Sequence, residues 1–400
     1  MRLSSAQIFQ QGISAILVQQ SKLQHTEQQL ATGRRMLTPA DDPVAAVQVL
    51  SLTEDLQLID QYQRNGSLAE GQLALEETVL ADVGNMLNRV RELVVQANNA
   101  SQSPESRRSI GTEIAARVDE LQALANTRDA SGEYLFAGFQ SHTEPFSRLG
   151  NSYSYNGDNG QRMLQVAGST QVAVRDSGFD VFMSVPTGNG TFDIEPAGTN
   201  TGTAVIGSNS ANGSFVADSY SIIFSQTTPA DPVTYQVVDS SAAVVASGNF
   251  LPGDNIEFAG VSVRFDGLPE NGDSFALSPS VRQDMFSTLQ NIVGHLEGAG
   301  SAPSELAALN NAMGQALNNI DQALGHVLNV RADVGVRLGH VESQLNINDS
   351  FNVQLQETLS EIQDLDYADA ISRFNLQLTT LEAAQQAYIK MQGLSLFNFL

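Results

Sequence analysis

Acidic side chains gather near the C-terminal end of the chain, at Glu361, Asp364, Asp366 and Asp369. Carboxyl groups held close together can exchange protons as a general acid and base, or bind a cation such as Ca²⁺. On a helix, however, Glu361 and Asp364 share one face while Asp366 and Asp369 share another, and no loop brings the four together. A solvated face, or one paired with a neighbouring subunit, therefore explains this group better than a catalytic or metal site.

The rest of the sequence lacks the spacing that common catalytic and ligand-binding sites require. It has no HExxH zinc motif, no GxSxG nucleophile elbow and no lysine after a glycine-rich phosphate loop. Cysteine is absent, which excludes disulfides and thiolate chemistry. Asp158, in the run NGDNG, lacks the other ligands of a calcium loop and indicates a hairpin turn. The histidines are scattered, with no pair four residues apart: His25, His142, His295, His326 and His340. We therefore expect no enzyme activity, no cofactor and no metal.

Composition narrows the choice of partners. The net charge of −24 makes nucleic acid and anionic membranes poor partners. No stretch reaches the roughly 20 apolar residues that a membrane span needs. The opening MRLSSAQIFQQGISAILVQQ has one basic residue and no small-residue cleavage site, so it does not resemble a secretory signal peptide. We expect either cytoplasmic residence or export without a cleaved signal.

Apolar residues at both ends of the chain recur at steps of three and four. They are Phe9, Ile13, Ile16, Leu23 and Leu30 near the N-terminus, and Ile371, Phe374, Leu378, Leu381 and Tyr388 near the C-terminus. Such spacing keeps one apolar stripe on one side of a helix, and a lone helix of about 22 residues has little stability in water. The final residues are also too apolar for a free tail: Leu394, Leu396, Phe397, Phe399 and Leu400. We predict that all of these residues form an assembly interface with the opposite terminus and with further copies of the chain.

Polar residues interrupt the two stripes. Gln20, Glu27 and Gln385 fall at positions that we expect to lie in the seam. Polar seam residues lower the stability of a helix pair and can fix its register. We therefore hypothesise that the terminal helices are largely disordered in the free monomer and fold during assembly.

Between the two ends, the sequence pattern changes from helical to strand-like and back to helical. Gly33 indicates the stop of the first helix, and Asp42 with Pro43 indicates the start of the next. From about 131 to 280, short alternating runs such as Tyr220, Ile222 and Phe224, separated by turn clusters, replace helical periodicity. Helical spacing then returns at about 281.

This pattern predicts an α+β multidomain fold: a folded-back rod of N- and C-terminal coiled-coil helices with an inserted β-rich domain. We expect three domains. Residues 1–40 with 350–400 would form a terminal coiled-coil assembly domain, residues 41–140 with 281–349 a helical rod domain, and residues 141–280 an inserted β-rich outer domain.

Several segments resemble the flagellin family. QLATGRRMLTPADDPVAA at 29–46 is similar to the segment that follows the first helix in that family, and its ending resembles the hook–filament junction branch. GEYLFAGFQSHTEPF at 132–146 is similar to that branch's passage into its inserted domain, and GLPENGDSF at 267–275 resembles a repeated turn of the hook-associated proteins. The end of the chain, 360–400, resembles a flagellin-family carboxyl terminus. The residues that carry the first two motifs are Gly33, Arg34, Asp41, Asp42, Pro43, Tyr134, Phe136 and Gly138.

The resemblance implies a structural adapter of the bacterial flagellum. Such proteins form a ring that joins the hook, through another hook-associated protein, to the flagellin filament and allows the filament to assemble. The implied partners are that hook-side protein, flagellin, further copies of the chain and a cytoplasmic export chaperone. The implied location is extracellular, at the hook–filament junction.

Three other functions remain open from the sequence. The chain could be filament flagellin itself, although the DDPVAA and LSLFNFL segments argue against this. It could be an enzyme with a catalytic site in the β-rich insert, although no catalytic pair is recognisable there. A secreted tip protein of an injection apparatus is the third alternative, which would be expected to lack the segments around Asp42 and Phe136.

Overall fold

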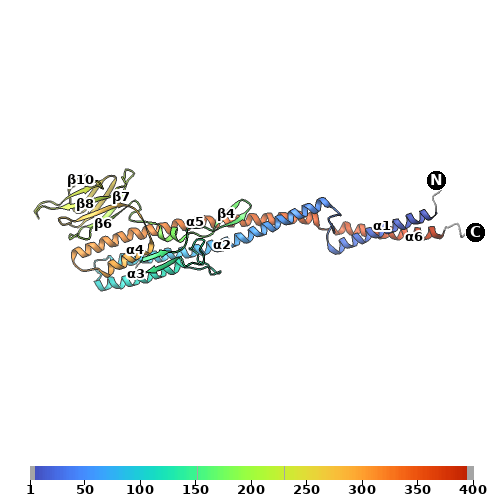
Figure 1. The fold of residues 1–400 in the computed structure, drawn as a ribbon, viewed down its shortest axis with the longest axis horizontal. Coiled ribbons are helices and arrows are strands. Elements are labelled where there is room, and N and C mark those ends of the chain that lie inside the picture. Colours follow the sequence, from blue (N-terminus) through green and yellow to red (C-terminus); the bar gives the residue numbers. More distant parts are fainter. Residues whose placement is uncertain (1–4, 151, 229, 394–400) are drawn as a thin grey trace, which may run out of the picture. The chain divides into compact units, whose positions relative to one another are not determined.

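The computed structural model describes residues 5–150, 152–228 and 230–393. They form two compact units, one within residues 1–65 and 344–400 and one spanning residues 66–343. We call these the terminal unit and the central unit. The helices, drawn in Figure 1, are α1 (Ser5–Thr32), α2 (Pro43–Ala97), α3 (Pro104–Ala125), α4 (Met285–Glu297), α5 (Pro303–Gln363) and α6 (Tyr367–Gly393). Helices α2 and α5 each contribute residues to both units.

The first two helix boundaries follow local signals in the sequence. Helix α1 ends before Gly33, whose φ of 71° is a left-handed conformation that favours glycine. The N–H of Gly33 donates to the carbonyl oxygen of Gln29 at 2.8 Å. Helix α2 begins at Pro43, and the Oδ1 atom of Asp42 accepts a hydrogen bond from the N–H of Ala45 at 3.1 Å. The stop and start predicted from these residues are confirmed.

The helices of the central unit bury the faces that their periodicity predicts. On α2, the three-four alternation lies wholly inside, with each side chain at most 1% exposed: Leu80, Val83, Leu87, Val90, Val94 and Ala97. Helix α5 contributes a matching buried series: Met313, Ile320, Val327, Val334 and Val341. Arg331 interrupts that series because its Nη2 atom pairs with Glu77 of α2 at 2.6 Å. Removing such surface from water contributes about 25 cal/mol per Å² of apolar area.

The central region is an antiparallel β structure. Its strands are β1 (Phe146–Leu149), β2 (Ser152–Tyr155), β3 (Met163–Ala167), β4 (Thr170–Ala173), β5 (Val185–Pro186), β6 (Phe192–Pro196), β7 (Val205–Ala211), β8 (Tyr220–Ser225), β9 (Thr234–Val238), β10 (Val244–Asn249), β11 (Asn255–Phe258), β12 (Val261–Asp266), β13 (Ser274–Pro279) and β14 (Arg282–Gln283). A five-stranded sheet has the order β10-β9-β8-β13-β6, and a three-stranded sheet has the order β11-β12-β7. The remaining described strands pair as β1–β2, β3–β4 and β5–β14. A short π-helix, η1 (Phe179–Met183), follows β4.

The two larger sheets share one apolar core. Tyr220, Ile222 and Phe224 alternate inward from β8, and they meet inward-facing residues of β12 such as Phe265. The ring centroids of Phe224 and Phe265 lie 5.4 Å apart in an edge-to-face arrangement. Because long helices from both ends of the chain flank this β-rich region in the sequence, the predicted fold class is confirmed.

One local prediction is wrong. The run NGDNG around Asp158 does not close a hairpin, because β2 before it pairs with β1 and β3 after it pairs with β4. Asp158 instead connects this loop to the segment 132–146, because its Oδ1 atom accepts hydrogen bonds from the N–H groups of Phe139 at 2.9 Å and Gly160 at 2.8 Å. These backbone hydrogen bonds lower the pKa of Asp158.

Amide side chains on α5 dock the β-rich insert. Asn311, Gln315 and Asn319 follow at steps of four residues and so share one helix face. Asn311 is buried, donates through Nδ2 to the carbonyl oxygen of Ala204 at 3.0 Å, and accepts through Oδ1 from the N–H of Ile206 at 2.7 Å. Its amide therefore pairs with the insert's backbone as a neighbouring strand would. Asn319 accepts in the same way from the N–H of a residue in the insert.

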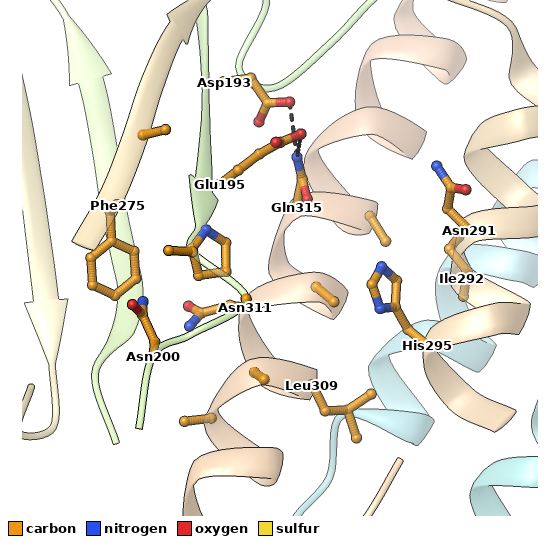
Figure 2. A pocket seen from close by; sticks show the side chains of 18 of the residues that line it. Asp193, Glu195, Asn200, Phe275, Asn291, Ile292, His295, Leu309, Asn311 and Gln315 are labelled. Carbon is orange, nitrogen blue, oxygen red and sulfur yellow. Dashed lines mark hydrogen bonds between the residues drawn. The ribbon is translucent and has the colours of Figure 1, made fainter. Parts of the chain in front are cut away.

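A cleft of about 730 Å³ lies beside these amides, between β6 and the helices α4 and α5. Figure 2 shows Asp193 and Glu195 of β6 converging on Gln315. The Nε2 atom of Gln315 donates to Asp193 Oδ2 at 2.9 Å and to Glu195 Oε1 at 3.3 Å. Burial raises the pKa of Asp193, and burial lowers the pKa of His295 on the α4 side. The insert is thus attached to α5 by directional polar contacts.

We predict that Asn311→Leu destabilises the central unit by roughly 2–4 kcal/mol, because it leaves a buried C=O and a half-buried N–H unpaired while keeping the side-chain volume. Denaturant unfolding of the full chain measures the change. Asn318→Leu, at a half-buried position of the same helix, is the matched control and should cost less than about 1 kcal/mol. Equal losses of stability in both variants would mean that the amide hydrogen bonds of Asn311 do not attach the insert to α5.

Candidate assembly interface

In the terminal unit, α1 and α6 lie side by side (Figure 1). The buried and half-buried residues on the facing sides recur at steps of three and four. They are Phe9, Gly12, Ile16, Gln19, Leu23, Thr26 and Leu30 on α1, and Ala370, Phe374, Gln377, Leu381, Ala384 and Tyr388 on α6. The rings of Phe9 and Tyr388 meet edge to face with centroids 6.1 Å apart. This is the spacing of a coiled-coil seam between the two ends of the chain.

The seam contains Phe9, Ile16, Leu23 and Leu30 of the predicted stripe and differs from it at the positions between them. Gly12 and Gln19 occupy it where the sequence suggested Ile13 and Gln20. The expectation that Gln20, Glu27 and Gln385 lie in the seam is wrong, since all three are exposed. A strict three-four alternation starting from Phe9 runs through 12, 16, 19, 23, 26 and 30, and it would have found the polar members.

The polar members of the seam each donate a hydrogen bond to a backbone carbonyl oxygen. Gln19 donates through Nε2 to the carbonyl oxygen of Gln377 across the seam, at 3.4 Å. Thr26 is buried and donates back to the carbonyl oxygen of Lys22 in its own helix, at 3.1 Å. Together with the small residue Gly12, they reduce the apolar area that the pair buries. The seam is therefore weaker than one filled with leucine.

A second apolar face of this helix pair stays uncovered. Ile13, Ile371 and Leu378, all predicted as interface residues, are 46%, 50% and 38% exposed. On α6, Ile389 shares the side of Ile371 and Leu378, because turns of about 100° per residue bring all three together. Uncovered apolar surface of this kind marks interaction sites. The proposed C-terminal members Leu394, Leu396, Phe397, Phe399 and Leu400 lie outside the described residues.

The segment 29–46 joins the two chain ends through backbone contacts. The N–H of Arg35 donates to the carbonyl oxygen of Gln363, and the N–H of Leu365 donates to that of Gly33, each at 2.9 Å. These bonds flank an antiparallel bridge between Arg34 and Asp364. The positive φ of Gly33 is what favours glycine at this point, because the nearest atom that a Cβ would meet is the movable hydroxyl of Tyr367.

The remaining motif residues of this segment shape its turn. Asp41 accepts hydrogen bonds through Oδ2 from the N–H groups of Thr38 at 2.8 Å and Leu37 at 2.9 Å, and these bonds lower its pKa. Its Oδ1 atom lies 3.2 Å from Nε2 of His25. With Asp42 and Pro43 starting α2, the motif fixes the passage from the first helix to the second.

The C-terminal acidic group also has local structural roles. Asp366 accepts through Oδ1 from the N–H of Ala368 at 2.9 Å at the start of α6, and Asp369 pairs with Arg373 at 2.9 Å. Asp364 accepts a hydrogen bond from Ser360 at 2.6 Å. Among the described residues, no group of three or more histidines and carboxylates is placed to hold a metal ion. Nor is any described helix both long and apolar enough to cross a membrane.

The segment 132–146 lies in the central unit, where Tyr134, Phe136 and Gly138 are buried. The guanidinium of Arg128 sits over the Tyr134 ring, 4.2 Å from its centroid. The ring of Phe136 meets that of Phe182 edge to face at 5.1 Å. Gly138 has a φ of 67°, and a Cβ atom there would fall 2.2 Å from the carbonyl oxygen of Asp158. These motif residues therefore build the core beneath the insert.

A buried charge network supports this motif, and no pattern in the sequence indicates it. Arg175 is 2% exposed and pairs through Nη2 with Asp129 at 2.6 Å and Glu133 at 3.0 Å. Burial favours protonation of Glu133, but hydrogen bonds from Ser141 and Arg162 outweigh it and lower the pKa. Because the partners are 46 and 42 positions apart in the chain, no local spacing signals the network.

Comparison with known proteins agrees with this organisation. Residues 4–141 match the bacterial flagellin N-terminal helical region, and residues 317–400 match the bacterial flagellin C-terminal helical region. The chain is 27% identical to flagellar hook-associated protein 3 of Escherichia coli over 401 residues, covering 100% of this chain and 99% of that protein.

Solved structures give a closer match. Crystal structures of FlgL from Xanthomonas campestris and of the flagellar junction protein FlgL from Legionella pneumophila are each 35% identical to this chain. The first has a TM-score of 0.72 and covers 77% of this chain and 99% of its own; the second has a TM-score of 0.73 and covers 79% and 100%. With both flagellin helical regions present and a match along the whole length, the chain belongs to the flagellin family and, within it, to the flagellar hook-associated protein 3 (FlgL) family.

Proposed function

We propose that this chain is the structural adapter of the bacterial flagellum that joins the hook, through another hook-associated protein, to the flagellin filament. Its similarity along the whole length to hook-associated protein 3, and to a junction protein from Legionella pneumophila, supports this role. The observation that carries the proposal is the uncovered apolar face of the α1–α6 pair, since an adapter must present surface to its neighbours in the assembly.

The two apolar faces of the terminal helices have different roles in assembly. The α1–α6 seam holds the pair together, and the second face remains for neighbouring subunits. Burying Ile13, Ile371 and Leu378 against another helix gains about 25 cal/mol per Å² of apolar area. That gain supplies the energy of association between subunits. It remains available because the seam, with its polar and small residues, does not cover these side chains inside one chain.

The family supports the remaining partners and the location. Copies of the chain form a ring at the hook–filament junction, outside the cell, with the hook-side protein below and flagellin above. Before export through the flagellar channel, a cytoplasmic chaperone holds the chain. The inserted β domain adds bulk and lateral surface to the ring.

The alternatives lose support. Filament flagellin is not favoured, because the matches that extend over the whole chain are to hook-associated protein 3. The family consists of structural flagellar proteins, which gives no support to an enzyme in the insert. An injection-apparatus tip protein would be expected to lack the segments TPADDPVAA at 38–46 and GEYLFAGF at 132–139, which this chain has.

A strain lacking this protein tests the proposal. We expect intact hooks without filaments, with flagellin lost unassembled into the medium, because polymerisation has no surface on which to begin. Electron microscopy counts the filaments, and immunoblotting of the medium measures flagellin. Normal filaments and motility in that strain would overturn the junction role.

The exposed face can be tested by a double variant, Ile371→Ser with Leu378→Ser. We expect it to fail to restore filaments in the deletion strain, while the purified chain loses less than about 1 kcal/mol of stability, because both residues are already exposed. Thr380→Ser with Ala387→Ser, at exposed positions on the opposite side of α6, is the matched control and should restore filaments. Full complementation by the first pair would show that this face is not an interface.

The hypothesis that the terminal helices order on assembly predicts a difference in hydrogen exchange. Backbone amides of α1 and α6 should exchange at nearly unprotected rates in the free monomer and become protected in assembled junctions, because the seam alone is weak. Amides of α2 within the central unit serve as the internal reference, since that face is fully buried. Protection of α1 and α6 already in the monomer would contradict the hypothesis.

A further inference from the structure

The short segment that ends β4 and continues beyond it connects to three different parts of the central unit. Arg175 points to the segment after α3, where it pairs with Asp129 and Glu133. Asp176 is bonded to Arg337 of α5, which also donates to the carbonyl oxygen of Ala173 at 3.3 Å. We call residues 173–178 the clasp.

The third connection of the clasp is a carboxyl group buried inside the protein. Glu76 of α2 is 0% exposed. Its Oε1 atom accepts a hydrogen bond from the N–H of Asp176 at 3.0 Å. Its Oε2 atom is also buried, and no described residue gives it a hydrogen bond. Leaving an ionised carboxylate in such a place costs far more than leaving a neutral acid there.

The charges around Glu76 do not neutralise it. From the clasp it faces the carboxylate of Asp176, and from α5 it faces Arg337, whose guanidinium already pairs with Asp176. On α2, the neighbouring Glu77 pairs with Arg331. Burial, followed by the negative charge of Asp176, raises the pKa of Glu76 to about 8. One guanidinium therefore faces two carboxyl groups. If both carboxyl groups were ionised, one negative charge would have no positive partner.

We propose that residues 173–178 form a proton-coupled clasp, which closes on α2 and α5 with one proton held between the carboxyl groups of Glu76 and Asp176. When the clasp opens, Glu76 becomes hydrated and releases that proton to solvent, while Arg337 keeps its charge. The clasp also holds the segment 132–146, because the N–H of Gly178 donates to the carbonyl oxygen of Phe136 at 3.0 Å. Opening thus loosens the support of that motif.

The pH dependence follows from the shift in the pKa of Glu76. An exposed glutamate titrates near 4.5, and the closed clasp holds its proton up to about 8. The open form therefore gains stability relative to the closed form as the pH rises from about 4.5 to about 8, and the difference levels off above that. Between these limits the opening equilibrium rises by up to about tenfold per pH unit.

Hydrogen exchange of the full-length protein, measured by mass spectrometry from about pH 6 to about pH 9, tests the clasp. Peptides covering residues 163–178 are compared between the wild type and Glu76→Gln at each pH, so that the intrinsic pH dependence of exchange cancels. The Glu76→Gln substitution keeps the side-chain volume and the acceptor for the Asp176 N–H, but it removes the titrating proton. We expect the ratio of wild-type to variant exchange to rise by up to about tenfold per pH unit up to about pH 8 and then to level off.

Two further variants complete the test. Glu77→Gln, at the next position of α2 and also paired with an arginine of α5, is the matched control and should keep the wild-type pH profile. Asp176→Asn removes the negative charge that faces Glu76, so the pH at which the exchange ratio levels off should be lower. A ratio that stays constant over the whole pH range, or a Glu77→Gln variant that flattens the profile as Glu76→Gln does, would overturn the proposal.

Discussion

Two neighbouring residues of opposite charge, Arg175 and Asp176, connect separate parts of the central unit. Their side chains pair with different parts of the unit: Arg175 with acidic partners after α3, and Asp176 with Arg337 on α5. Removing one member of a buried ion pair leaves an uncompensated charge and typically costs about 3–5 kcal/mol. The buried acid Glu76 joins the same point through the N–H of Asp176. The helices, the motif around Phe136 and the entry to the β-rich insert therefore share one electrostatic junction.

The two units differ in how much of their apolar surface they bury, and this difference connects the fold to its role. In the central unit, the periodic faces of α2 and α5 are fully buried within one chain. In the terminal unit, the α1–α6 seam contains Gly12, Gln19 and Thr26, while Ile13 and Ile371 remain exposed. A self-sufficient helix pair would also fill those small and polar seam positions with large apolar residues and would leave fewer of them exposed. Placing them outside the seam weakens the monomer and favours association, which suits a part of the flagellum.

Much of the fold could be predicted from the sequence, because its determinants are local. Gly33 and Asp42 mark helix ends by conformation and capping, and the runs of alternating residues mark the strands. The division of the terminal apolar residues between the seam and the exposed face could be predicted only in part, since Ile13 falls outside the seam although its spacing fits almost as well. The bonds of Arg175 and Asn311 could not be predicted, because their partners are distant in the chain and amides and arginines occur equally on solvated faces.

The attachment of the insert shows why the unpredictable contacts matter. An apolar interface between α5 and the β domain would be strong but tolerant of sliding, because the hydrophobic effect has no direction. Asn311 instead pairs with both a carbonyl and an N–H of the insert, and each bond is lost by a shift of about 1 Å. Gln315 and Asn319 repeat this constraint along the same helix face. In the proposed function, apolar surface supplies the association energy of the terminal helices, whereas directional hydrogen bonds fix the position of the insert on α5.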